Sequence, residues 1–145
     1  MIAVDTNILV YAHRRDSEWH EKAYRVIQSL AEGSAPWAIP WPCIHEFLAV
    51  VTHPRIYRPP TPLAKALDQA EIWLGSPSLR TISELKGHWK ELRGLAETGR
   101  VSGGAIHDAR VAAICLEHGV RELWSADRDF GRLSGITVRN PLVAR

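Results

Sequence analysis

The chain has few cysteines, and it lacks several features that mark specialised classes of protein. Only Cys43 and Cys115 occur in 145 residues, and no second cysteine stands near either. A disulfide and a paired-thiolate metal site are therefore disfavoured, and each thiol is expected to be a buried side chain. No apolar run approaches the roughly 20 residues that cross a bilayer, and the first residues lack the basic segment of a signal peptide. We therefore expect a cytoplasmic protein without membrane contact.

The sequence also lacks repeats, low-complexity tracts and any recognisable linker. No Gly-x-Gly-x-x-Gly follows the first expected strand, which disfavours dinucleotide binding. With 46% hydrophobic and 23% charged residues, the composition is that of one ordinary domain, which we expect to cover residues 1–145. The net charge of +2 permits a nucleic-acid partner but does not by itself indicate one.

What is present is an alternation of short β-like runs with stretches of helical periodicity. The expected strands are residues 2–4, 37–40, 79–82, 122–125 and 136–138. The expected helices are residues 17–32, 42–52, 61–74, 84–98 and 103–118. Strands that alternate with helices predict an α/β fold, here a three-layer α/β/α sandwich around a mainly parallel sheet.

Apolar residues at helical spacing predict which helix faces are buried. In the helix over 61–74, the expected inner residues are Leu63, Ala66, Leu67, Ala70 and Leu74. In the helix over 84–98, they are Trp89, Leu92 and Ala96. Most of the six tryptophans are expected in the core or at a subunit interface. Trp41, which stands between two prolines, is the one expected to be exposed near a functional site, where it could stack on an unpaired base.

Four acidic residues occupy positions where a parallel sheet gathers ligands. Asp5 ends the first strand and Asp127 follows the strand over 122–125, so both are expected at the carboxyl edge. Glu46 lies about one turn into a helix, and Asp108 lies in the first turns of another, where the helix dipole favours an anion. Carboxylates gathered closely repel one another, and a hard divalent cation relieves that repulsion. Such a site suits phosphodiester hydrolysis by metal-activated water.

Spacing alone leaves other interpretations open. An aspartate after a strand or at a helix start is commonly a turn or helix cap. His45 and His107 each precede an acid and could share a zinc site, although neighbours of ligands on a helix usually point elsewhere. An aspartyl-nucleophile phosphatase would use Asp5, but Asn7 stands where that chemistry usually needs a second acid.

Four short motifs occur in order along the chain. They are Val4-Asp5-Thr6-Asn7, Ile44-His45-Glu46-Phe47, Ile106-His107-Asp108-Ala109 and Trp124-Ser125-Ala126-Asp127-Arg128-Asp129-Phe130. Each motif alone is weak, but together they resemble the PIN-domain nucleases, in particular the VapC-type toxins of bacterial toxin–antitoxin modules. The resemblance spans residues 2–141, which is nearly the whole chain.

The resemblance implies a compact α/β/α sandwich that assembles as a homodimer. It implies a Mg²⁺-dependent endoribonuclease toxin that cleaves structured RNA such as tRNA or ribosomal RNA. The metal, Mg²⁺ or Mn²⁺, would be held by Asp5, Glu46, Asp108 and Asp127, and a VapB-like antitoxin would bind the toxin and obstruct the acidic site. A non-catalytic RNA- or protein-binding relative is the alternative, and the presence of all four acids argues against it.

Neighbours of these acids are candidates for orienting them. The hydroxyls of Thr6 and Ser125 could orient a carboxylate or a metal-bound water, or stabilise a turn. Asn7 could orient Asp5 or a water, or begin the next helix. The fourth acid of the resemblance is Asp127 or Asp129; Asp127 is favoured because it comes first after the strand, and Asp129 is then a possible helix cap.

Basic residues near the expected site suggest where RNA is held. Arg14 and Arg15 follow the first strand closely, and Arg55 and Arg58 lie on the loop after the helix of Glu46. Arginine suits phosphate contact because its planar fork can bind two oxygens at once. We expect some of these residues to contact RNA phosphates, with solvated surface charge as the alternative.

Overall fold

A five-stranded parallel sheet forms the centre of the molecule. The computed structural model describes residues 1–143, apart from the side chain of Asp129. The strands are β1 (Ile2–Val4), β2 (Trp37–Pro40), β3 (Leu79–Ile82), β4 (Glu122–Trp124) and β5 (Thr137–Arg139), in the order β3-β2-β1-β4-β5. The chain builds outward from β1 on one side and then crosses to the other, so the direction of winding changes between β1 and β4. In such sheets a ligand crevice opens at this point.

The register of β1 aligns the carboxyl ends of the central strands. Val4 stands opposite Trp124, and the Asp5 N–H donates to the Trp124 carbonyl at 3.0 Å. Ala3 and Val4 are fully buried, as expected for a strand covered on both faces. The residues that follow β1 and β4 therefore emerge side by side at one edge of the sheet.

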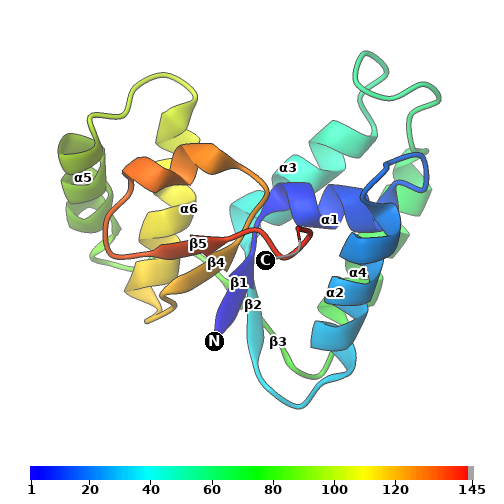
Figure 1. Cartoon of the computed structure of the whole chain (residues 1–145), viewed down its shortest axis with the longest axis horizontal. Helices are drawn as coiled ribbons and strands as arrows, with labels where there is room; N and C mark the ends of the chain where they lie inside the picture. Colours follow the sequence, from blue (N-terminus) through cyan, green and yellow to red (C-terminus); the bar gives the residue numbers. More distant parts are fainter. Residues whose placement is uncertain (144–145) are drawn as a thin grey trace.

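Six helices flank the sheet in two groups (Figure 1). They are α1 (Thr6–His13), α2 (His20–Glu32), α3 (Trp41–Val51), α4 (Leu63–Leu74), α5 (His88–Gly99) and α6 (Ala105–Glu117), and a short 3-10 helix covers Arg128–Arg132. Helix α1 packs on α2 and α3, α3 packs on α4, and α5 packs on α6. The predicted α/β/α sandwich with a parallel sheet is confirmed. None of the described helices combines the length and apolar character that a bilayer span requires.

The main error in the predicted elements is helix α1, which the sequence pattern did not reveal. Its residues Ile8, Leu9 and Val10 are all buried, so the segment is apolar on several faces and shows no one-sided period. Two predicted helices also begin too early. The Trp19 N–H donates to Ser17 Oγ at 3.1 Å in a turn that precedes α2, and α5 begins only at His88.

The predicted inner face of α4 is partly wrong. Ala66 and Ala70 are buried as expected, together with Trp73, while the leucines point outward, with exposed fractions of 61% for Leu63, 47% for Leu67 and 38% for Leu74. Trp73 on this face contacts Phe47 of α3, so the face of α4 that carries the two alanines is the one that packs on α3. The predicted inner face of α5 is wrong in the same way. Trp89 was expected to be buried but is 69% exposed, and Leu95, which was not expected to be buried, is buried.

Edge contacts between aromatic rings hold α3 against α1 and α4. Phe47 is fully buried, and its ring makes edge contacts with His13 at 5.3 Å and with Trp73 at 4.8 Å between centroids. Edge-to-face pairs of this kind add to the area that the rings bury. The predicted burial of both cysteines is also confirmed, and both are free thiols.

We expect Phe47→Ala to lower the free energy of unfolding by about 3–5 kcal/mol, because it leaves a cavity between three helices. Urea denaturation followed by circular dichroism measures the change. Ile72→Ala is the matched control, since Ile72 is 70% exposed and its truncation should change stability by no more than about 0.5 kcal/mol. Equal losses in the two variants would contradict the packing described.

His13 makes the stability of the fold depend on pH. Burial lowers the pKa of His13 below its ordinary value, and the charges of Arg14 and His20 act in the same direction. The ring is held by Gln69 Oε1 and Thr61 Oγ1, each at 3.1 Å. The folded state therefore favours the neutral imidazole.

A lowered folded-state pKa means that the stabilisation from neutral His13 is present above the unfolded value, near pH 6.5, and is lost as the pH falls through the folded value. We expect His13→Gln to flatten this acid-side loss when melting temperature is measured between pH 7.5 and 5. His53→Gln, at an exposed histidine, is the comparison. A wild-type slope in His13→Gln would refute the assignment.

Candidate active site

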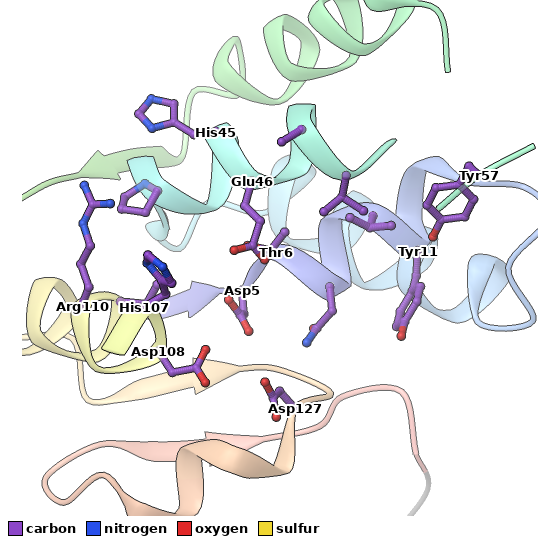
Figure 2. Close-up of a pocket in the computed structure, with 16 residues that line it drawn as sticks. Asp5, Thr6, Tyr11, His45, Glu46, Tyr57, His107, Asp108, Arg110 and Asp127 are labelled. Carbon is purple, nitrogen blue, oxygen red and sulfur yellow. The ribbon is translucent and has the colours of Figure 1, made fainter. Parts of the chain in front are cut away.

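A cleft of about 480 Å³ opens at the carboxyl ends of β1 and β4. All four predicted acids line it: Asp5, Glu46, Asp108 and Asp127. Figure 2 shows their carboxylates directed into a common space. The structure therefore brings together four acids that stand up to 122 positions apart in the sequence.

Each acid reaches the cleft from a different element. Asp5 follows β1 directly and precedes the first turn of α1. Glu46 lies on α3, where it is exposed while its neighbour Phe47 is buried. Asp108 lies in the first turn of α6, where the helix dipole favours a negative charge. Asp127 follows β4 and is half-buried.

Asp5 is the most buried of the four acids, with 7% of its surface exposed. The Ser125 hydroxyl donates to Asp5 Oδ2 at 2.8 Å, and the Cys43 thiol donates a weaker bond to Oδ1 at 3.6 Å. Burial raises the pKa of Asp5, the charge of Glu46 raises it further, and the bonds from Ser125 and the Thr6 backbone oppose the shift. An ionised Asp5 is therefore costly unless a positive charge enters the cleft.

The Ser125 hydroxyl joins the ends of the two central strands. It donates to Asp5 and accepts hydrogen bonds from Asn7 Nδ2 at 3.2 Å and from the Asp127 N–H at 3.0 Å. Asn7 Oδ1 in turn accepts the Ala126 N–H at 3.1 Å. Asn7 lies in the first turn of α1, one residue after the helix begins at Thr6. It bonds to Ser125 and Ala126, and its predicted role of orienting Asp5 or a water stays a prediction.

The thiol of Cys43 has a contact that sequence reasoning missed. The sequence indicated only a buried packing residue, whereas the structure places the thiol against Asp5. Burial, followed by the charge of Asp5, raises the pKa of Cys43 well above its ordinary value. No pattern in the sequence marks this contact, because it joins α3 to the end of β1.

The donor chemistry of the site fits a hard divalent cation. All four side chains offer carboxylate oxygens, and their mutual repulsion favours a bound positive charge. Within the described part of the chain, no three His, Cys, Asp or Glu side chains already stand in an arrangement that holds an ion. The same finding gives no support to a zinc site at His45 and His107.

Of the two candidates for the fourth acid, Asp127 and Asp129, the structure describes only the side chain of Asp127. Asp127 lines the cleft. Asp129 lies in the 3-10 helix over Arg128–Arg132, and its side chain lies outside the described residues. The preference for Asp127 therefore stays a prediction.

Arg14, predicted to contact phosphate, makes its contacts within the protein. Its Nε and Nη2 donate to the Asp16 carboxylate at 2.9 and 2.6 Å. Its Nη1 donates to the Pro59 carbonyl at 3.0 Å and to Thr61 Oγ1 at 3.2 Å. The guanidinium also lies 4.2 Å from the centre of the Tyr57 ring. Arg14 therefore connects α1 to the loop before α4.

The other residues expected to contact RNA are more dispersed. Arg15 is exposed and lines a separate hollow. Arg55 and Arg58 are exposed on the loop after α3 and do not line the cleft. Trp41 is half-buried, with its ring 6.0 Å from that of His45, and His45 lines the cleft. Trp41 is thus close to the site but less exposed than predicted.

Several cleft residues received no role from the sequence. Tyr11 and Tyr57 line one part of the cleft, and Arg110 lines another. Arg110 is paired with Glu84 through Nη2 at 2.6 Å. No motif marks these positions, because they come from a helix, a loop and a second helix that only folding brings together.

Comparisons with known proteins agree with this geometry. The family model of the PIN domain matches residues 2–136. Ribonuclease VapC48 of Mycobacterium tuberculosis is 32% identical over 137 residues, which cover 94% of each chain. A VapC ribonuclease of Mycobacterium bovis is 34% identical over 142 residues, which cover 98% of this chain and 96% of the relative.

Solved structures show the same fold. The crystal structure of VapC20 of Mycobacterium tuberculosis, named as a sarcin–ricin loop cleaving toxin, has a TM-score of 0.69 at 18% identity and covers 97% of this chain and 100% of its own. VapBC2 from Rickettsia felis, bound to a DNA fragment from its promoter, has a TM-score of 0.68 at 21% identity, with coverages of 97% and 98%. Since the family model spans nearly the whole chain and VapC relatives exceed 30% identity, the chain belongs to the PIN domain family, in its VapC-type group.

Proposed function

We propose that this chain is a Mg²⁺-dependent endoribonuclease and the toxin of a type II toxin–antitoxin system. The observation that carries the proposal is the convergence of Asp5, Glu46, Asp108 and Asp127 on one cleft. The relatives above 30% identity are named ribonucleases, which supports RNA as the substrate. VapC20 is named for cleaving the sarcin–ricin loop, and we propose structured RNA, either tRNA or ribosomal RNA, as the target class here.

The side chains of the cleft divide the work between binding and positioning. The four carboxylates would hold Mg²⁺, with Mn²⁺ as a possible substitute. When bound, the metal supplies a Lewis acid that polarises the phosphodiester and activates water. The Ser125 hydroxyl donates to Asp5 and so holds its carboxylate in one orientation. It also accepts the Asp127 N–H, which fixes the position of Asp127 relative to Asp5. Arg15, Arg55 and Arg58 are exposed and free to approach RNA phosphates outside the cleft.

The partners follow from the same site. A VapB-like antitoxin that covers the cleft would exclude RNA from the acids, and several solved neighbours are complexes of a toxin with its antitoxin. We propose a cytoplasmic homodimer as the free form of the toxin. A non-catalytic binding module is the alternative, and four acids facing one cleft disfavour it because they would repel RNA without a cation.

The first test is cleavage of purified total RNA in Mg²⁺. We expect wild-type protein to release discrete fragments and Asp5→Asn to be slower by at least about 100-fold, because it removes one charge that holds the metal. Asp68→Asn, at an exposed acid on α4, is the matched control and should cleave like wild type. Equal activity in Asp5→Asn would trace the cleavage to another site or a contaminant.

Metal binding is tested without RNA by thermal unfolding. A ligand that binds only the folded state raises the melting temperature, and the rise grows with the ratio of its concentration to its Kd. We therefore expect Mg²⁺ or Mn²⁺ at about 5 mM to stabilise wild-type protein. EDTA should reverse the shift. Asp5→Asn should show little or no shift, while Asp68→Asn should respond like wild type. A shift of the same size in Asp5→Asn would place the metal elsewhere.

A further inference from the structure

The cleft is chemically different at its two ends. The four acids occupy its middle, and His107 and Arg110 lie at one end (Figure 2). Tyr11 and Tyr57 lie together at the opposite end (Figure 2). Both tyrosines are only partly buried, so aromatic surface is open to a molecule that enters the cleft.

The ring of Tyr57 is held in place by the protein. Tyr57 lies on the loop between α3 and α4, and its N–H donates to the His53 carbonyl at 3.0 Å. The Arg14 guanidinium stacks on the ring at 4.2 Å. Arg14 is itself held by the Asp16 carboxylate and by the carbonyl of Pro59 on the same loop. An aromatic ring that is braced in this way loses little conformational freedom when a ligand stacks on it.

The cleft is also lined by apolar side chains that are close in sequence to the tyrosines. Val10 of α1 precedes Tyr11, and Ala49 and Val50 lie in the last turns of α3, before the loop of Tyr57. The phenol of Tyr57 remains neutral, since burial raises its pKa above the ordinary value. A flat, uncharged group is therefore accepted here more readily than a phosphate, which needs hydrogen-bond donors or positive charge.

From this arrangement we infer that Tyr11 and Tyr57 form a binding subsite for one unpaired base of the RNA substrate, and that Arg14 is a positioning residue that holds Tyr57. The inference rests on the proposed function, which puts the scissile phosphate over the acids. A base next to that phosphate reaches the tyrosines only if it is unstacked, as in an RNA loop or single strand. Stacking on an aromatic face tolerates any base, so the subsite selects unpaired structure rather than a particular nucleotide.

The test is binding of a fluorescent 12-nucleotide single-stranded RNA of mixed sequence, followed by anisotropy in Ca²⁺. This cation offsets the charge of the acids, and its larger, less regular coordination is expected to support little cleavage. We expect Tyr57→Leu to weaken binding about 5- to 160-fold, which corresponds to the loss of stacking on one base. Tyr57→Phe keeps the ring and should bind like wild type. Tyr24→Leu, at an exposed tyrosine on α2 outside the cleft, is the matched control and should also bind like wild type.

A second probe separates stacking from contact with the RNA backbone. The same oligonucleotide is made with abasic sites in place of its bases, so that phosphates and sugars remain. We expect Tyr57→Leu and wild-type protein to bind this probe equally. A loss in Tyr57→Leu that is as large on the abasic probe as on the intact RNA would overturn the base subsite, as would unchanged binding of intact RNA.

The role of Arg14 is tested by its dependence on Tyr57 and on salt. Arg14→Gln should weaken binding in wild-type protein but cause no further loss in Tyr57→Leu. Because Arg14 acts through Tyr57, the salt dependence of binding should not change. A slope reduced by about 0.7, the value for one phosphate contact on a single strand, would show that Arg14 binds phosphate and is not a positioning residue. Melting temperatures of all variants identify any that fail to fold. If Arg14→Gln fails to fold, Arg14→Lys takes its place.

Cleavage of total RNA by wild-type protein in Mg²⁺ separates this inference from the proposed function. If the wild type cleaves RNA and Tyr57→Leu binds RNA normally, the subsite is wrong and the nuclease assignment stands. If Tyr57→Leu loses affinity for intact RNA alone while the wild type fails to cleave, the subsite stands and the catalytic proposal is wrong. A wild-type protein that neither binds nor cleaves RNA overturns both.

Discussion

The parallel pairing of β1 with β4 is the constraint on which the site depends. It aligns Val4 with Trp124, so Asp5 and Ser125 leave the sheet next to each other and form a buried hydrogen bond of 2.8 Å. A shift of one residue in this register would turn the side chains of β1 to the opposite face. The aspartate would then point into the core, and the network through Asn7 and Asp127 would be lost. The positions of Asp5 and Asp127 at the acidic cleft are therefore consequences of one strand pairing.

Burial and like charge act together in the cleft. Asp5 is nearly enclosed, and its carboxylate is opposed by both desolvation and the charge of Glu46. The protein offsets this cost only in part, with hydroxyl, thiol and backbone donors. An arrangement that favours an external cation is destabilised by its own charges, as is common at sites where function and stability compete. The edge contacts of Phe47 with His13 and Trp73 stabilise α3 at the residue next to Glu46.

In the proposed function, recognition and chemistry occupy different parts of the same cleft. Asp5 and Asp127 follow strands of the sheet, while Tyr57 lies on a loop that Arg14 contacts. Loops on a rigid scaffold commonly carry the contacts that differ among relatives. In the proposed function, the acidic centre would carry the chemistry and the segment between α3 and α4 would contact the substrate. Arg14, which the sequence offered as an RNA contact, makes its contacts with Asp16 and with this segment.

The sequence by itself was enough for the fold class, the family and all four acids that line the cleft, because strand periodicity and ordered motifs are local properties. Helix α1 was missed because burial on several faces removes the one-sided period that marks a helix. The leucines of α4 were misplaced because the face that packs against α3 is the one that carries Trp73 and the two alanines. The thiol of Cys43 against Asp5, the tyrosine end of the cleft and the brace at Arg14 join segments far apart in the chain. Only three-dimensional packing brings such residues into contact, because the residues next to them in the sequence do not indicate which distant side chains they will contact.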